Sequence, residues 1–128
     1  MKNIFGIGTD IVDISRLKEL FKKNKKFKKR IFSVNEIKFC ELKKNKIHSY
    51  SKRFAAKEAF VKALGTGFRK GISFNEISIN NDRKGAPFIV LLGKTKISVA
   101  NLIKRKNKIY LSLSDEKKYA LAMVVISC

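Results

Sequence analysis

The sequence predicts an α+β protein in which helices pack on an antiparallel sheet. Patterns typical of helices are concentrated in the first half of the chain, after one opening strand, and patterns typical of strands dominate the second half. In that second half, short polar segments join successive strand patterns, as in hairpins. Hairpin strands pair antiparallel, and helices that are segregated from the strands distinguish the α+β class from alternating α/β folds.

Length and composition indicate a folded globular chain. It has 128 residues, of which 45% are hydrophobic, with one proline and seven glycines. We therefore expect residues 1–128 to form a single domain. A chain of this size buries roughly two-thirds of its unfolded surface, which is enough for a core without disulfides or metals.

An opening strand and two capped helices are predicted in the first third of the chain. Residues 3–12 are typical of a strand, with four side chains on one face: Phe5, Ile7, Thr9 and Ile11. Asp13 is placed as the N-cap of a helix whose apolar side chains recur at helical spacing: Ile14, Leu17, Leu20 and Phe21. Ser33 and Glu36 have capping-box spacing, so a second helix is expected over 33–44.

A lysine-rich run and a polar connection flank this second helix. Residues 22–30, KKNKKFKKR, are typical of a solvated loop or helix face, with a docking patch as the alternative. Residues 44–53 are polar, and we expect a connection there. A third and most apolar helix then covers 53–65 and ends at Gly65, because glycine is common just after a helix C-terminus.

The second half is expected to contain two hairpins around a short helix. Residues 73–80 and 87–92 are strand patterns separated by NDRKGA, which predicts the first hairpin. Residues 94–105 favour a short helix. Residues 109–114 and 119–127 are separated by DEKK, which predicts the second hairpin.

The chain is strongly basic. Its 30 lysines and arginines against 10 acids give a net charge of +20. Such a surface attracts polyanions, and nucleic acid, an anionic membrane and an acidic protein all qualify as partners. Biased genome composition is an alternative origin, because lysine, asparagine and isoleucine are all abundant. Lysine outnumbers arginine 24 to 6, and arginine is the better bidentate reader of phosphates and bases, which disfavours a dedicated nucleic-acid role.

Several other classes of protein are disfavoured. Cys40 and Cys128 fit no metal or redox spacing, and with a single histidine a zinc site is not expected. We expect a reduced, cytoplasmic protein. Asp10 interrupts the first apolar run, so no signal peptide is indicated. The longest apolar stretch, near 119–126, falls short of the roughly 18 residues that a membrane helix needs.

The helix over 53–65 has charged residues in the gaps of an apolar surface. On a helical wheel, two apolar arcs are formed by Ala55, Ala56, Ala59, Phe60, Ala63 and Leu64, and by Phe54 and Val61. Glu58 and Lys62 share one gap, and Arg53 and Lys57 share the other. The first pair is either an exposed ion pair one turn apart, contributing about 0.3–0.5 kcal/mol, or a partly buried slot in which Lys62 or a hard cation such as Mg²⁺ offsets the desolvated carboxylate.

A second carboxylate and a glycine-rich tail have two interpretations each. Asp10 follows Gly-Ile-Gly-Thr near the end of the first strand, as a helix or turn cap or as an acid at a place that a ligand can approach. A dinucleotide fingerprint is rejected because Ile11 stands where the third glycine belongs. Gly65, Thr66 and Gly67 either end the helix or offer backbone N–H groups and a hydroxyl to a phosphate.

These segments together resemble the holo-[acyl-carrier-protein] synthases of the 4′-phosphopantetheinyl transferase superfamily. The segments that resemble the family are GIGTDIVDISRL (6–17), FSVNEIKFCE (32–41) and KRFAAKEAFVKALGTG (52–67), in that order and spacing. ISINND…GAPFIVL and LSLSDEKKYALAMVVI extend the resemblance over essentially the whole chain. The first and third segments are highly specific when they occur together.

The resemblance implies an activity and a site. The 4′-phosphopantetheine arm would move from coenzyme A to a serine of an apo acyl carrier protein, in support of fatty acid biosynthesis. Asp10 and Glu58 match the family's metal ligands, with Mg²⁺ bridging them to the pyrophosphate. Lys62 would face the phosphates as a catalytic and coenzyme-binding residue, and Gly65 and Thr66 would line the coenzyme site.

The resemblance also implies partners. Arg16 matches a basic family position on the first helix that contacts the carrier protein, although a plain surface arginine is the alternative. Acyl carrier proteins are strongly acidic, which suits the charge of this chain. A homotrimer is expected, with the coenzyme site between neighbouring subunits, and neither nucleic acid nor membrane is an expected partner.

The chain departs from the family pattern at three positions. Tyr110 stands where many members have a histidine, and tyrosine does not titrate near neutrality. Asp115 occupies another polar position of the same segment. Ala86, within GAP (85–87), replaces the usual lysine. A degenerate member that binds coenzyme A without turnover is therefore one alternative, and an RNA- or ribosome-associated domain is the other.

Overall fold

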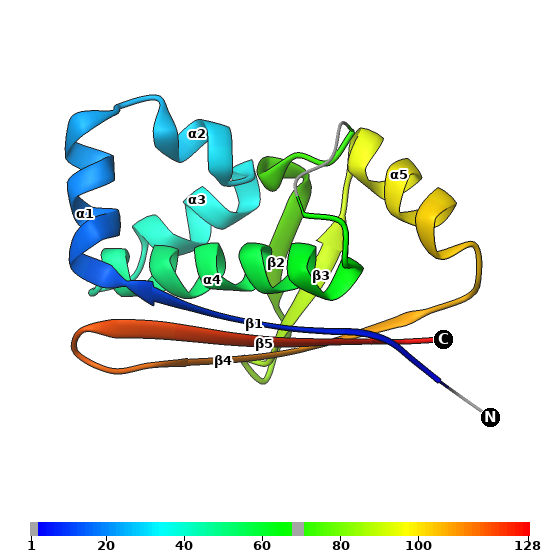
Figure 1. The fold of residues 1–128 in the computed structure, drawn as a ribbon. Coiled ribbons are helices and arrows are strands. Elements are labelled where there is room, and N and C mark those ends of the chain that lie inside the picture. The colour runs from blue at the N-terminus through cyan, green and yellow to red at the C-terminus, as the bar shows by residue number, and fades with distance from the viewer. Residues whose placement is uncertain (1–2, 68–70) are drawn as a thin grey trace.

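In the described part of the chain, helices α1 to α5 pack on two small antiparallel sheets, which is an α+β arrangement (Figure 1). The computed structural model describes residues 3–67 and 71–128. In chain order the elements are β1 (Ile4–Asp13), α1 (Ile14–Lys23), α2 (Phe27–Ile31), α3 (Val34–Glu41), α4 (Lys46–Leu64), a 3₁₀ turn (Phe74–Glu76), β2 (Ile77–Asn81), β3 (Pro87–Leu91), α5 (Gly93–Ile103), β4 (Lys108–Asp115) and β5 (Tyr119–Ser127). The predicted class is confirmed.

The strands form two antiparallel sheets. The larger sheet has the order β1-β5-β4, and β2 and β3 form the smaller one. Both predicted hairpins are present, as β2–β3 and β4–β5. The sequence patterns did not indicate that β5 also pairs with β1, the first strand of the chain. This pairing places Asp10 opposite Ala122 and makes β5 the central strand.

Helix α4 lies against the backbone of β1 because two glycines leave room for it. A Cβ atom on Gly6 would come within 1.7 Å of the Ala63 carbonyl oxygen, and one on Gly8 within 1.8 Å of the Ala59 carbonyl oxygen. The two contacts have matching spacing along β1 and α4, because two strand residues advance about 6.6 Å and four helix residues advance about 6 Å. Asp10 follows Gly6 and Gly8 on the same strand face, so it also lies on the side of α4.

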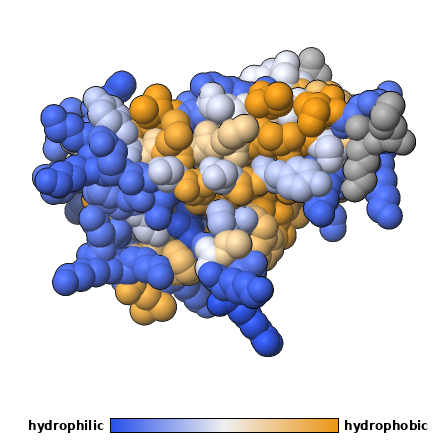
Figure 2. Space-filling view, turned by 90° about the horizontal axis from the view of Figure 1, so that it is seen from below, coloured by the Kyte–Doolittle hydropathy of each residue, from blue (hydrophilic) through white to orange (hydrophobic). Residues whose placement is uncertain are grey.

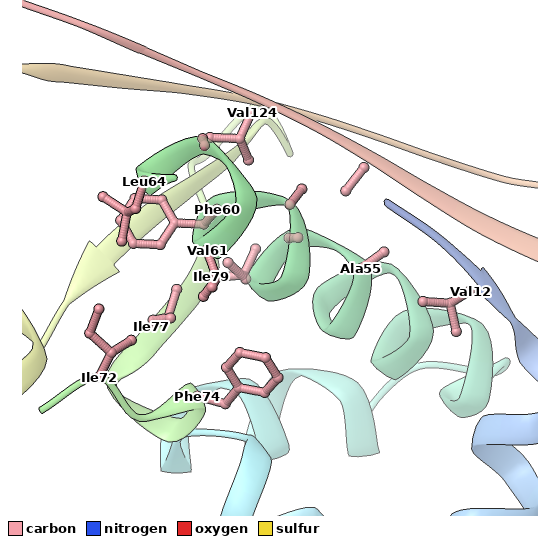
Figure 3. Packing of buried hydrophobic residues seen from close by; sticks show 14 of the residues in the cluster. Val12, Ala55, Phe60, Val61, Leu64, Ile72, Phe74, Ile77, Ile79 and Val124 are labelled. Carbon is pink, nitrogen blue, oxygen red and sulfur yellow. The ribbon is translucent and has the colours of Figure 1, made fainter. Parts of the chain in front are cut away.

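The hydrophobic core lies between α4 and the two sheets (Figure 3). The apolar arc predicted for this helix is buried along its whole length: Ala55, Ala56, Ala59, Phe60, Ala63 and Leu64. Ile77 and Ile79 of β2 pack from one side, and Val124 of β5 packs from the other. These contacts hold α4, and the charged residues on it, in a fixed rotation relative to β1. That residues 1–128 form one domain stays a prediction.

The predicted helix ends are confirmed at three places. The Asp13 side chain caps α1 by accepting a hydrogen bond from the Ser15 N–H at 3.0 Å. Ser33 and Glu36 form the expected capping box at the start of α3. Gly65 follows α4 with a φ of 77°, in the left-handed region that glycine tolerates best.

Three predicted boundaries differ from the structure. Helix α4 begins at Lys46, so 44–53 is largely helical rather than a connection. Its polar side chains there hid the pattern, because Ser49 and Ser51 are buried although serine is usually exposed. Residues 74–76 form a 3₁₀ turn before β2 instead of extending the strand. Helix α3 ends at Glu41 rather than at 44. The lysine-rich run over 22–30, expected as a loop or a helix face, contains the end of α1 and most of α2.

No helix within the described ranges is long and apolar enough to cross a membrane.

Candidate active site

Asp10 and Lys62 form an ion pair across the contact between β1 and α4. Lys62 Nζ lies 3.1 Å from Asp10 Oδ1 and donates a second hydrogen bond to the Thr9 carbonyl oxygen at 2.9 Å. The Asp10 side chain is 18% exposed and that of Lys62 is 56% exposed. The ammonium therefore reaches a largely covered carboxylate from the surface. Helical side chains lean toward the N-terminus of their helix, which directs Lys62 toward Asp10.

Glu58 lies one turn before Lys62, and the charges of both Asp10 and Lys62 affect its pKa. Burial raises the pKa of Glu58, the negative charge of Asp10 raises it further, and the Lys62 ammonium lowers it. The structure thus favours the partly buried slot over the exposed pair, since Glu58 is half-buried and Lys62 pairs with Asp10. The alternative of Asp10 as a cap is wrong, because Asp13 caps the helix.

The two carboxylates, Asp10 and Glu58, fit a magnesium ion whose remaining ligands come from substrate and water. No group of three or more Asp, Glu, His or Cys side chains placed for a metal occurs within residues 3–67 and 71–128. Mg²⁺ is commonly held by one or two carboxylates, with waters and substrate phosphates completing its octahedron. The Lys62 ammonium between Asp10 and the Thr9 carbonyl oxygen shows that this place accepts a cation.

The other predicted site residues lie outside this cluster, two of them nearby in sequence and one on a separate surface. Gly65 and Thr66 follow the end of α4, three and four residues beyond Lys62. The Thr66 hydroxyl donates to the Gly67 carbonyl oxygen at 3.1 Å. Arg16 is exposed on α1. The structure brings Asp10, Glu58 and Lys62 together, places Gly65 and Thr66 nearby along α4, and leaves Arg16 on a separate surface.

Comparison with known proteins places this geometry in a family. The family model described as the 4′-phosphopantetheinyl transferase superfamily matches residues 6–124. The chain belongs to the 4′-phosphopantetheinyl transferase superfamily. It is therefore an enzyme of the transferase class, as the motifs predicted.

Individual relatives agree over nearly the whole chain. The holo-[acyl-carrier-protein] synthase of Pelagibacter ubique is 46% identical over 128 residues, covering 96% of each chain. The crystal structure of the holo-[acyl-carrier-protein] synthase from Neisseria meningitidis matches with a TM-score of 0.87 and 38% identity, covering 97% of this chain and 98% of that one. The Helicobacter pylori synthase, solved in complex with coenzyme A, matches with a TM-score of 0.80 and 35% identity, covering 94% and 98%.

Glu58 also borders a cavity on the helical side of this transferase. The cavity has a volume of about 550 Å³ and is lined by Phe27, Arg30, Ile31, Phe54, Glu58, Ile72, Ser73, Phe74 and Asn75. Most of this lining is apolar, and Glu58 contributes its acidic group. The carboxylate therefore lies between the polar cluster at β1 and an apolar space, which agrees with the burial that raises its pKa.

A second cavity is strongly basic, and sequence reasoning missed it. This basic cavity has a volume of about 700 Å³, and its cationic lining residues are Lys43, Lys44, Lys52, Arg53 and Arg83. They come from the start of α4, the segment before it and the turn between β2 and β3. The sequence held a signal for one of them, since Arg53 occupied a gap in the apolar surface of the helical wheel. Nothing local indicated that the other segments converge on it.

Arg53 is the most unusual residue of the basic cavity. Its side chain is 2% exposed, and its guanidinium stacks on the Phe39 ring at 4.2 Å. It donates to Ser49 Oγ at 3.1 Å and to Asn81 Oδ1, while its Nε has no hydrogen-bond partner among the described residues. Burial lowers the pKa of Arg53. A buried guanidinium held by neutral partners can still accept an anion.

His48 and Asp115 meet at the same cavity. His48 Nδ1 lies 2.9 Å from Asp115 Oδ2, and Lys52 Nζ lies 3.6 Å from Asp115 Oδ1. No motif around this single histidine of the chain predicts the contact. Tyr110, another of the three positions that depart from the family pattern, points away from α4 and is 44% exposed on the outer face of the sheet. Tyr110 and Asp115 therefore lie in different surroundings.

A buried ion pair next to Glu58 was also missed. Lys57 and Glu36 are both 0% exposed, with Nζ 2.6 Å from Glu36 Oε1. The ammonium also donates to the carbonyl oxygens of Phe74 and Ile77. Burial lowers the pKa of Lys57 to about 8, and the neighbouring Glu36 charge raises it. The wheel placed Lys57 in a gap, but only the packing of α3 and β2 onto that gap buries it.

Proposed function

We propose that the protein transfers 4′-phosphopantetheine from coenzyme A to a serine of an apo acyl carrier protein. The observation that supports this most directly is the convergence of Asp10, Glu58 and Lys62 from two elements remote in sequence. The matched relatives are holo-[acyl-carrier-protein] synthases, and one of them was solved with coenzyme A. We infer that the reaction supports fatty acid biosynthesis, the role expected from the family resemblance.

Asp10 and Glu58 would hold the magnesium ion. When bound, Mg²⁺ would neutralise charge on the pyrophosphate and act as a Lewis acid toward its oxygens. The two carboxylates supply only part of an octahedron, which leaves positions for phosphate oxygens. Positioning and charge neutralisation are what phosphoryl transfer asks of a protein, since little covalent chemistry involves its side chains.

The chain's own residues then account for the remaining requirements of the reaction. The serine hydroxyl of the carrier protein attacks the β-phosphorus, a new P–O bond forms, and adenosine 3′,5′-bisphosphate leaves with the old bridging oxygen. Glu58 would help a bound water take up the serine proton. Lys62, one turn further along α4, would neutralise charge that develops on the leaving phosphate.

The outer face of the larger sheet supports a homotrimer. Six apolar or aromatic side chains on this face are between 42% and 63% exposed: Ile7, Ile11, Tyr110, Tyr119, Leu121 and Met123. Figure 2 views the molecule from this side and shows hydrophobic residues gathered over the middle, with hydrophilic ones around them. An uncovered apolar patch of this kind marks an interface. Packing these faces around a threefold axis would cover them.

A ring of three copies would also complete the coenzyme site. Asp10 lies on β1, at one edge of the larger sheet, and Asp115 at the basic cavity lies on β4, at the opposite edge. Head-to-tail contacts in a closed ring bring opposite edges of neighbouring copies together. We infer that the cationic residues of the basic cavity, Arg53 above all, receive phosphate groups of a coenzyme whose pyrophosphate lies at the neighbour's Asp10 and Glu58.

The first helix suits the carrier protein. Arg16 is exposed on α1, and five lysines of the run over 22–30 are exposed around it and α2: Lys22, Lys23, Lys25, Lys26 and Lys29. An acidic partner would be steered to this surface, which raises the association rate more than the affinity.

Cys40 and Cys128 are both free thiols, which supports a reducing, cytoplasmic location.

The test is incubation with coenzyme A, Mg²⁺ and an apo acyl carrier protein, read by intact mass. We expect the carrier to gain one phosphopantetheine, and a chelator to prevent it. Asp10→Ala and Glu58→Ala should each reduce the rate by a factor of 100 or more while the circular dichroism spectrum stays unchanged, a loss of about 2.7 kcal/mol of transition-state stabilisation. Glu116→Gln, which removes an exposed acid in the β4–β5 turn, is the matched control and should keep full activity. Undiminished transfer by either alanine variant would contradict the assignment of that ligand.

A further inference from the structure

Lys62 occupies the place that a metal ion would need. Its ammonium contacts Asp10 Oδ1 at 3.1 Å and the Thr9 carbonyl oxygen at 2.9 Å, two oxygen atoms of the kind that Mg²⁺ prefers. The Asp10 carboxylate is mostly covered, at 18% exposed. A covered carboxylate without a counter-charge is costly, so the lysine supplies the positive charge while no other cation is bound.

The same side chain has room to leave. Lys62 is 56% exposed, and its four-carbon stem can swing through solvent without disturbing the core. By contrast, the buried ammonium of Lys57 is held by Glu36 and two carbonyl oxygens and cannot exchange partners without opening the structure. Lys57 and Lys62, two of the four lysines of α4, therefore differ in kind: Lys57 is a permanent counter-ion, and Lys62 can be displaced.

We propose that Lys62 is an exchangeable counter-cation that couples metal binding to coenzyme binding. A divalent ion displaces the ammonium from Asp10, and a phosphate group of coenzyme A receives it. This inference rests on the proposed function, because it takes the metal and the coenzyme from there. It adds that the lysine has two positions, and that its first position competes with the metal.

The coupling follows from charge. A metal ion and an ammonium cannot both occupy the oxygens of Asp10 and Thr9, because like charges at contact distance repel strongly in a partly buried site. Without coenzyme, the metal must displace Lys62 into water. With coenzyme, the displaced ammonium gains a phosphate partner, so the displacement is easier. By linkage, the metal must then raise coenzyme affinity by the same factor as the coenzyme raises metal affinity.

The test measures metal binding rather than turnover. Mn²⁺ serves as the probe, followed by electron paramagnetic resonance and calorimetry, with and without coenzyme A and with no carrier protein present. The key variant is Lys62→Met, which keeps the stem and removes the charge. Lys96→Met, an exposed lysine on α5, is the control for the loss of one positive charge. Circular dichroism verifies that each variant is folded.

For Lys62→Met, the competition should disappear. We expect Mn²⁺ alone to bind roughly fivefold or more tightly than to the wild-type chain, within the usual range of coupling between sites. We also expect coenzyme A to enhance Mn²⁺ affinity less in this variant than in the wild type, because only direct coordination by the pyrophosphate remains. Lys96→Met should match the wild type in both measurements.

Different results would overturn the lysine exchange and the proposed function. If the wild-type chain binds Mn²⁺ and transfers the arm, yet Lys62→Met binds Mn²⁺ no more tightly than the wild type or Lys96→Met, the exchange is wrong and the proposed function stands. If the wild-type chain binds no Mn²⁺ even with coenzyme A present, the metal site and the exchange are both overturned. Tighter Mn²⁺ binding by Lys62→Met with unchanged enhancement by coenzyme A would overturn the coupling.

Discussion

Replacing Lys57 with methionine should destabilise the protein more than any change to its exposed lysines. The variant keeps the length of the side chain but leaves the Glu36 carboxylate buried without its cation, at 0% exposure. Glu36 would retain hydrogen bonds from the Ser33 and Ile79 N–H groups, at 2.9 and 3.2 Å. Those neutral donors compensate part of the charge, so the group stays in place at a higher energy.

The magnitude follows from the geometry of the pair. Removing one partner of a buried ion pair typically costs about 3–5 kcal/mol, because an uncompensated charge stays behind. Here Lys57 also gives up contacts with the carbonyl oxygens of Phe74 and Ile77, which supports the upper half of that range. For a chain of this length, that free energy corresponds to a fall in melting temperature of roughly 10–20 °C.

The assay is urea denaturation followed by circular dichroism, with a thermal melt alongside. The double variant Lys57→Met with Glu36→Gln removes both charges and should be more stable than Lys57→Met alone, because the carboxylate no longer lacks a partner. Lys96→Met should stay within about 0.5 kcal/mol of the wild type. The reasoning fails if Lys57→Met loses less than about 1 kcal/mol, or if the double variant loses the sum of both single losses.

Three further changes test the fold and the assembly. Gly8→Ala should lower the free energy of unfolding by about 1–3 kcal/mol and slow phosphopantetheine transfer, because the added Cβ would meet the Ala59 carbonyl oxygen and push β1 away from α4. An unchanged urea midpoint together with an unchanged transfer rate would contradict this. Hydrogen bonds from Tyr50, Lys46 and Lys28 lower the pKa of Glu41 to about 2. The contribution of ionised Glu41 to the free energy of unfolding is therefore present above pH 4.5 and lost as the pH falls toward 2. In urea titrations, the difference in stability between the wild type and Glu41→Gln should narrow over that interval, and a constant difference would refute the contribution of this ionised group. Leu121→Asp should disperse the proposed trimer into 14.6 kDa monomers by light scattering; an equal mass for both proteins would count against the interface.

Local signals in the sequence determined the helix ends and the hairpins. The Asp13 cap, the Ser33 and Glu36 capping box and the glycine after α4 depend on residues within four positions of each other, so each could be predicted without knowing the fold. The motif spacing likewise selected Asp10 and Glu58 and indicated the family, which the comparison with known proteins confirmed. The helical wheel correctly separated the apolar arcs of α4 from its charged gaps.

The tertiary structure alone decided what each gap faces. The gap with Lys57 is covered by α3 and β2 and becomes a buried ion pair, whereas the gap with Lys62 opens at the surface and reaches Asp10 on β1. The tertiary structure likewise pairs β1 with β5, from opposite ends of the chain, and brings together the cationic side chains that line the basic cavity. A side chain's local pattern shows its direction on its own helix, but its partners depend on which distant surfaces pack there. For that reason the sequence determined which residues carry charge, and packing decided which charge is permanent and which can exchange.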